Sequence, residues 1–280
     1  MKIGVAMFCT DYSMAPGEIA RAAEERGFDS FWAPEHSHIP LSRSSPFPSG
    51  GELPKQYYDV MDPFVVLTAA AAATRTLLVG TGVCLVVQRD PIQTAKLVAS
   101  IDQVSGGRFL FGVGDGWNAD EMANHGTAFE TRHKLARERI EAMKAIWSKP
   151  KPEYHGEFVN FDPMMAWPKP VRKPWPPIYV GGAMPYGLRR ALRYGDAWLP
   201  HRARPAYPDV AEKIPEARRL MQEAGRDLPI TIWGGRPEPA MLERDRRLGV
   251  ERVIVSLPSE RADTILPLLD TWAGLVPKLA

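Results

Sequence analysis

The sequence is poor in cysteine and lacks any long apolar run. Its 280 residues include two cysteines, Cys9 and Cys84, which lie far apart in segments expected to form strands. Two such thiols have neither metal-ligand spacing nor the density of a disulfide scaffold, so we expect both to be buried and free. No segment reaches the ~20 apolar residues that cross a bilayer. Even the apolar stretch 65–80 is interrupted by Arg75.

An excess of one charge is also missing. Lys and Arg total 35, Asp and Glu total 33, and the basic residues are scattered rather than gathered in one block. This balance does not favour nucleic acid or an anionic membrane, so a small-molecule partner is expected. Residues 1–13 hold a short apolar run broken by Gly4, without a cleavage site of small residues. They predict a first strand in a soluble, cytoplasmic protein rather than a secretion signal.

Short aliphatic runs alternate about eight times with longer segments whose apolar residues recur every three or four positions. The expected strands are 2–8, 28–34, 77–86, 108–113, 177–181, 196–199, 229–233 and 252–257. The expected helices are 16–26, 62–73, 91–104, 119–147, 185–194, 208–225, 237–248 and 260–275. Eight such pairs predict a (β/α)8 TIM barrel, because right-handed crossovers wind parallel strands in one direction until the sheet closes. A doubly wound open sheet is the alternative.

Several expected helices carry start and stop signals. Asp62 and Asp90 each precede a proline, which places a capping acid before a residue that tolerates the first helical turn. Gly27, Gly225 and Gly249 each stand between an expected helix and the next strand, as left-handed C-terminal caps do.

Two segments fit no strand-helix pair. Residues 37–61 are rich in Pro, Gly and Ser, and residues 149–176 are rich in Pro and aromatics and contain a possible hairpin, "YHGEFVNFD". We expect one barrel domain over residues 1–280, with both insertions covering its mouth, since long loops in barrels usually shape the active site.

The stretch "EHSH" ends the second expected strand and therefore lies at the mouth, where barrel functional groups gather. Glu35, His36 and His38 are candidates for metal binding, for proton transfer or for simple loop packing. A His-x-His pair holds zinc in some barrel hydrolases, but such a site needs ligands from other strands. Only His201 is expected nearby, so we predict no metal site and treat His38 as a loop residue.

Two glycine-rich segments also reach the mouth. "FLFGVGDGWNADE" does not match the dinucleotide fingerprint, because Trp117 occupies the position of its third glycine. Its bare backbone instead predicts close approach of a flat ligand. "IYVGGAMPYGLRRALRYGDAW" is a strand, two glycines and a helix, so N–H groups of residues 182–187 form a candidate phosphate cradle. Arg189 and Arg190 are either part of this cradle or solvated.

Three stretches carry a family resemblance: residues 27–40, 77–121 and 176–200. The middle one is the most specific, since it combines R-x-P-x-x-x-A-K, D-x-x-S-G-G-R and a glycine-rich strand end. The chain resembles the luciferase-like flavin and deazaflavin oxidoreductases over nearly its full length, and especially their coenzyme F420-dependent branch.

The resemblance implies a flavin-like ring laid into the barrel mouth. It assigns His36, Glu35 and Asp115 to catalysis. It implies that the cofactor contacts Glu35, Gly82, Val83, Asp115, Asn118, Gly181, Gly182 and Ala183. In this family a non-prolyl cis peptide lies behind the ring, and Gly82 and Val83 match its position. Asp115 stands where the best-known sugar-phosphate dehydrogenases of the family have a glutamate, which argues against that substrate.

The resulting hypothesis is hydride transfer between carbon 5 of F420 and a small organic substrate, with His36 exchanging the proton. Glu35 either orients or polarises His36 or binds the ring. Trp117 and Trp167 are either walls of the substrate pocket or core residues. The resemblance further implies a homodimer. Three other hypotheses remain: an FMN-dependent monooxygenase using O2, a non-catalytic flavin-binding protein and a metal-dependent hydrolase.

Overall fold

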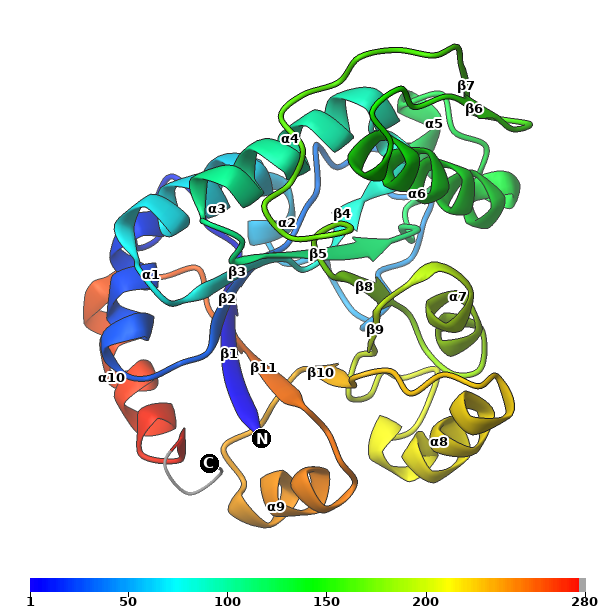
Figure 1. Ribbon diagram of the computed structural model, residues 1–280. Coiled ribbons are helices and arrows are strands. Elements are labelled where there is room, and N and C mark those ends of the chain that lie inside the picture. Colours follow the sequence, from blue (N-terminus) through cyan, green and yellow to red (C-terminus); the bar gives the residue numbers. More distant parts are fainter. Residues whose placement is uncertain (277–280) are drawn as a thin grey trace.

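Parallel strands pair around a nearly closed barrel in the computed structural model, which describes residues 1–276 (Figure 1). Their order is β10-β11-β1-β2-β3-β5-β8-β9, and isolated bridges from Trp198 to Ile230 and from His201 to Trp233 join the two ends. The strands are β1 Lys2–Met7, β2 Ser30–Ala33, β3 Leu78–Thr81, β4 Cys84–Leu85, β5 Phe109–Gly114, β8 Ile178–Gly181, β9 Ala197–Leu199, β10 Thr231–Trp233 and β11 Arg252–Leu257. The predicted TIM barrel is confirmed, and the open sheet is wrong.

Helices surround the strands as an outer ring (Figure 1). They are α1 Pro16–Glu25, α3 Pro63–Ala73, α4 Pro91–Val104, α6 Arg132–Ser148, α7 Tyr186–Tyr194, α8 Ile214–Glu223, α9 Pro239–Arg247 and α10 Ala262–Ala273, with short α2 Gln56–Asp59 and α5 Ala119–Asn124. Single 3-10 turns cover η1 Val86–Gln88, η2 Phe129–Thr131 and η3 Val210–Lys213. None of the helices within residues 1–276 is long and apolar enough to cross a membrane.

The predicted helix boundaries are largely confirmed by cap geometry. The Asp62 carboxylate accepts from the N–H of Phe64 at 2.8 Å, and that of Asp90 accepts from Gln93 at 2.8 Å. Gly27 has a φ of +77°, in the left-handed region that favours glycine after a helix.

Two predicted elements are interrupted in the structure. The strand expected over 77–86 breaks at a cis peptide between Gly82 and Val83, which separates β3 from β4. The helix expected over 119–147 ends after α5 and resumes at η2 and α6, because Gly126 adopts a φ of +73°. Both breaks lie at the C-terminal end of the barrel, where the chain departs from regular structure.

The barrel interior is filled at its N-terminal end. Trp32 and Tyr179 pack edge to face with ring centroids 5.5 Å apart. Arg252, only 1% exposed, pairs with Asp29 at 2.9 Å between guanidinium nitrogen and carboxylate oxygen. Such a buried charge is tolerated because it is paired and hydrogen-bonded. The interior is therefore closed below and available to a ligand only at the mouth.

The two insertions have different positions. Residues 37–61 follow β2 and lie over the mouth. Residues 149–176 pack on the outer helices: the hairpin of β6 Tyr154–His155 and β7 Asn160–Phe161 lies against α6 at the edge of the molecule (Figure 1), and residues 167–172 contact α4. This insertion follows a helix and precedes a strand, so its two ends are anchored at the opposite end of the barrel from the mouth. None of the residues that line the mouth cavity comes from 149–176, so its role as a mouth cover stays a prediction.

Candidate active site

A cavity of about 310 Å³ opens at the C-terminal ends of the barrel strands. Its lining comes from the ends of most strands and from Phe47, Pro48 and Tyr57 of the 37–61 insertion. The volume is at the lower end of the usual range for small-molecule sites. One wall is aromatic, the floor is rich in glycine, and charged groups lie at two ends.

The structure brings most of the predicted site residues together around this cavity. The lining includes Glu35, His36, Gly82, Val83, Asp115, Gly181, Gly182 and Ala183. Asn118 does not line it. The amide oxygen of Asn118 instead accepts from the backbone N–H of Glu121 at 3.2 Å and caps α5.

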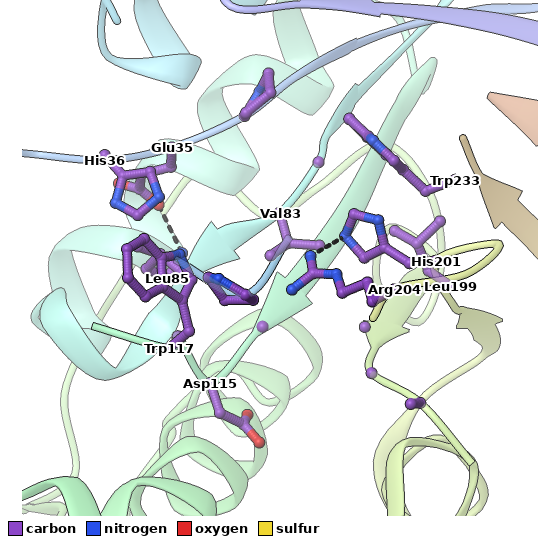
Figure 2. A pocket seen from close by; sticks show the side chains of 18 of the residues that line it. Glu35, His36, Val83, Leu85, Asp115, Trp117, Leu199, His201, Arg204 and Trp233 are labelled. Atoms are coloured by element: carbon purple, nitrogen blue, oxygen red, sulfur yellow. Dashed lines mark hydrogen bonds between the residues drawn. The ribbon is translucent and has the colours of Figure 1, made fainter. Parts of the chain in front are cut away.

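The Glu35 carboxylate is anchored beneath the cavity. One oxygen accepts from the N–H of Leu85 at 2.6 Å (Figure 2). The other accepts from Nε of Arg89 at 2.5 Å. Arg89 also pairs with Asp62 at 2.5 Å, at the start of α3. Glu35 is therefore tied to the chain that follows the cis peptide, and its hydrogen bonds do not go to His36.

The carboxylate that contacts His36 is Glu121, in the first turn of α5. Its Oε2 lies 2.8 Å from Nδ1 of His36, and its Oε1 accepts from the N–H of Ser37 at 3.2 Å. The Glu121 side chain is fully buried. Sequence reasoning missed this partner, because a glutamate in a first helical turn is an ordinary helix feature. The signal that the sequence offered was that Glu121 and His36 both follow strands that end at the mouth, where their side chains could meet.

This contact orients the imidazole. A carboxylate accepts, so Nδ1 of His36 donates, and Nε2 is the nitrogen available to a ligand. The ring lies between aromatic neighbours, with centroid distances of 5.4 Å to Tyr57 and 5.7 Å to Trp117. His36 is thus held in one tautomer and one orientation at the cavity wall.

The cavity floor is shaped by glycines around the cis peptide. A Cβ on Gly114 would lie 2.4 Å from Cγ2 of Val83, and one on Gly82 would lie 2.2 Å from the Trp233 ring. Larger residues at these positions would displace the floor. Figure 2 shows Val83 between the groups of the two walls.

At one end, Asp115 is paired with two basic side chains. Its Oδ2 lies 2.5 Å from Nδ1 of His133 and 3.0 Å from Nε of Arg190. His133, Ala183 and Arg190 also line an adjoining hollow of about 430 Å³. The cavity therefore continues past the Gly181–Ala183 turn toward the N-terminus of α7.

This glycine turn packs tightly on α7. Gly182 has a φ of +123°, and a Cβ on Gly187 would lie 2.2 Å from the Gly182 oxygen. Of the two arginines left open by the sequence, Arg190 lines the cavity, whereas Arg189 is exposed and lies beside Tyr186, 5.9 Å from its ring.

At the other end, His201 accepts a hydrogen bond at Nε2 from the Arg204 guanidinium, at 2.6 Å. Burial, reinforced by the Arg204 charge, lowers the pKa of His201 to about 3, so the ring is neutral. Tyr207 and Trp233 complete this end. No sequence motif marked Arg204 or Tyr207.

Trp117 lines the cavity as expected. Trp167 does not, since it is 59% exposed on the 149–176 insertion. His38 bonds to the Ser37 hydroxyl at 2.9 Å and to Asn124 at 2.8 Å within the loop region. In the part of the chain that the structure describes, no three His, Cys, Asp or Glu side chains form a group able to hold a metal ion. Cys9 and Cys84 are buried and free, as predicted.

The chain has sequence relatives over its full length. An uncharacterized protein of Mycobacterium tuberculosis strain H37Rv is 39% identical over 280 residues, which is 98% of each chain. An F420-dependent hydroxymycolic acid dehydrogenase of the same organism is 29% identical over 222 residues, covering 76% of this chain and 55% of that protein.

Solved structures share the fold. The monooxygenase RslO1 from Streptomyces bottropensis matches with a TM-score of 0.82 at 20% identity, covering 100% of both chains. An F420-dependent secondary alcohol dehydrogenase in complex with an F420–acetone adduct matches with a TM-score of 0.78 at 19% identity, covering 100% of this chain and 99% of that one.

The family model described as luciferase-like monooxygenase matches residues 15–238. The match includes the mouth segments of β2, β3, β5, β8 and β9 that build the cavity. The chain belongs to the luciferase-like monooxygenase family of oxidoreductases.

Proposed function

We propose that this protein transfers a hydride between the deazaflavin coenzyme F420 and a small organic carbonyl or alcohol. The observation that carries the proposal is the His36–Glu121 pair beside a glycine-rich floor. It supplies an oriented proton donor and acceptor next to a surface that a flat ring can approach. A relative described as an F420-dependent dehydrogenase supports the choice of coenzyme.

The residues present fit a planar ring with a phosphate-bearing chain. Gly82 and Gly114 leave the floor without side chains, and their replacement would require movement of Trp233 or Val83. The hollow beyond the Gly181–Ala183 turn is lined by the basic groups His133 and Arg190, which suit an anionic chain.

In the reducing direction, a deazaflavin held in this cavity would supply the hydride that the carbonyl carbon takes up. His36 donates a proton from Nε2 to the carbonyl oxygen, so that the C=O double bond becomes a C–H and an O–H bond. In the oxidising direction, His36 accepts the hydroxyl proton instead. Glu121 holds the imidazole in place and stabilises the protonated ring by its negative charge.

The surrounding residues keep the site in shape. Tyr57 and Trp117 flank His36 and limit access of water to it. Glu35 and Arg89 anchor the chain after the cis peptide, which keeps Val83 in place at the cavity wall. These residues position the reacting groups and exchange no proton in the proposed reaction.

The proposal is tested by mixing the purified protein with reduced F420 and a panel of aldehydes and ketones, and following reappearance of deazaflavin fluorescence. We expect turnover that depends on the protein. The His36→Asn variant should lower kcat by ~10² to 10⁴-fold, while the Kd for F420 changes by less than about threefold. Equal rates for the two proteins would remove His36 from the mechanism.

An FMN-dependent monooxygenase is the second candidate. The description of the family and the fold of RslO1 favour it. The same cavity would then hold reduced FMN beside O2 and an organic substrate. Oxygen consumption with reduced FMN, together with the absence of F420-linked turnover, would favour this function over the first.

A further inference from the structure

Arg204 differs from the other arginines at the cavity in its hydrogen-bond and charge partners. Arg190 is paired with Asp115, and Arg89, beneath the floor, is paired with Glu35. Arg204 lines the cavity, but no carboxylate oxygen of residues 1–276 lies within 4.0 Å of its nitrogens. Its positive charge is therefore not balanced locally by the described part of the chain.

The side chain that holds Arg204 is neutral. Nη2 of Arg204 donates to Nε2 of His201 at 2.6 Å. An acidic partner would cancel the guanidinium charge, whereas a neutral imidazole fixes its direction and leaves the charge in place. Nη1 and Nε make no hydrogen bond within residues 1–276 and remain as donors.

The position of Arg204 directs these donors into the cavity. The backbones of Arg204 and Tyr207 bond to each other across a tight turn, with N–O distances of 3.3 Å and 2.9 Å. Figure 2 shows the guanidinium reaching from beside His201 toward Val83, on the other side from His36. A ligand above Val83 is therefore contacted by His36 from one wall and by Arg204 from the other.

We propose that Arg204 binds a carboxylate of the substrate, so that the substrates of this enzyme are small oxo acids or the matching hydroxy acids. This inference rests on the proposed function, since the acid would be reduced or oxidised beside His36. A guanidinium presents parallel N–H groups that match a carboxylate in two-point contact.

The chemistry of this end favours a carboxylate over a phosphate group. Besides His201, the phenols of Tyr57 and Tyr207 lie near enough to Arg204 to be affected by its charge, and they add hydrogen-bond donors but no charge. One positive charge matches the single charge of a carboxylate. The basic groups His133 and Arg190 lie at the opposite end of the cavity and are paired with Asp115.

The test compares matched substrates. Straight-chain oxo acids, with the keto group two to five carbons from the carboxylate, are assayed against their methyl esters with reduced F420. For at least one spacing we expect kcat/KM of the acid to exceed that of the ester by ~10-fold or more. In Arg204→Gln this ratio should fall to about one, because kcat/KM for the acid falls, while the Kd for F420 changes by less than about threefold.

Matched variants complete the design. Arg219→Gln removes an exposed arginine of α8 that pairs with Glu223, and it should leave the acid-to-ester ratio unchanged. Arg204→Lys keeps the charge but loses the two-point contact, and it should give an intermediate ratio.

Equal rates for acids and esters in the parent protein would overturn the inference while leaving F420-linked turnover intact. Loss of F420 binding in Arg204→Gln would also overturn it, since Arg204 would then contact the cofactor. If F420 does not bind the parent protein, the proposed function fails. Calorimetric titration of the same oxo acids into the protein without cofactor still tests Arg204: binding lost in Arg204→Gln supports the inference, and binding unchanged overturns it.

Discussion

His36 has two acidic neighbours, one next to it in sequence and one 85 positions away. The adjacent Glu35 is committed to Leu85 and Arg89, and the distant Glu121 contacts the imidazole. A dyad of this kind fixes the tautomer and offsets the charge that develops on the ring during proton transfer. At the scale of residues, Glu121 is therefore the positioning group in the proposed reaction.

The Glu121→Gln variant separates charge from shape. It keeps an acceptor oxygen near His36 but removes the negative charge, so we expect kcat to fall by ~10 to 100-fold, with KM and the Kd for F420 changed by less than about threefold. Steady-state kinetics and fluorescence titration measure these quantities. Glu130→Gln, on the exposed turn η2, is the control. A kcat equal to that of the parent protein would show that the charge has no role.

The sequence identified the mouth residues but not their pairing. Glu35 and His36 are adjacent in the chain, which suggested a working pair. Yet adjacent residues at a strand end point in different directions. Glu121 belongs to the short helix α5 and Arg204 to a loop, and no local spacing in the sequence indicates which side chain either one contacts.

At the scale of elements, caps and anchors decide where the barrel strands begin. Glu24 of α1 accepts hydrogen bonds from the N–H groups of Arg75, Thr76 and Leu77 at 2.6 to 2.9 Å. Burial alone raises the pKa of the Glu24 carboxyl, but these backbone bonds and one from the Thr76 hydroxyl outweigh it and lower the pKa to about 2. Glu24 thereby fixes the start of β3.

The lowered pKa of Glu24 makes the stability of the folded chain depend on pH in a definite direction. The pKa of Glu24 is lower in the folded chain than the ordinary 4.5, so the stabilisation is complete above pH ~4.5 and disappears as the pH falls toward 2. We expect Glu24→Gln to reduce the free energy of unfolding by ~1.5 to 3 kcal/mol at pH 7. Denaturant unfolding from pH 7 to pH 2.5 measures it.

The difference in free energy of unfolding between the parent protein and Glu24→Gln should become smaller as the pH falls from ~4.5 toward 2. Glu25→Gln, an exposed neighbour on the same helix, is the control and should follow the parent protein. If this difference in free energy stayed constant with pH, the carboxylate charge of Glu24 would contribute nothing to stability.

The elements themselves were largely predictable. Alternation of apolar runs gave the eight strand-helix pairs, and Asp62, Asp90 and Gly27 marked real helix ends. The misjudged elements were the continuous strand 77–86 and the continuous helix 119–147. Each was interrupted near a glycine: Gly82 precedes a cis peptide bond, and Gly126 adopts a φ of +73°.

At the scale of the molecule, the connection of an insertion decides its function. The 37–61 segment leaves a strand at the mouth and supplies Phe47, which packs near Tyr57 and Trp117 at centroid distances of 5.1 Å and 6.1 Å. The 149–176 segment leaves a helix and packs outside the barrel. The order of strands and helices in the sequence separates the two segments, since one follows a strand and the other follows a helix. Their composition does not separate them, because both are rich in proline.

Two single substitutions test the difference. Phe47→Ala removes apolar cavity wall, so KM for the substrate should rise by ~10-fold. Tyr154→Phe removes a hydroxyl bond to Glu141 of 2.7 Å on the other insertion, and should cost ~1 kcal/mol of stability without changing kcat or KM. Steady-state kinetics and thermal melts distinguish the two. Equal kinetic effects would contradict this assignment.

The central claim is that the mouth of this barrel holds a deazaflavin beside His36. An equilibrium fluorescence titration of the purified protein with F420, and separately with FMN, tests it most directly. We predict saturable binding of one F420 per chain, at least ~10-fold tighter than the binding of FMN, which is a difference of about 1.4 kcal/mol. Binding of F420 should be retained in His36→Asn. Tight binding of FMN with no binding of F420 would contradict the claim.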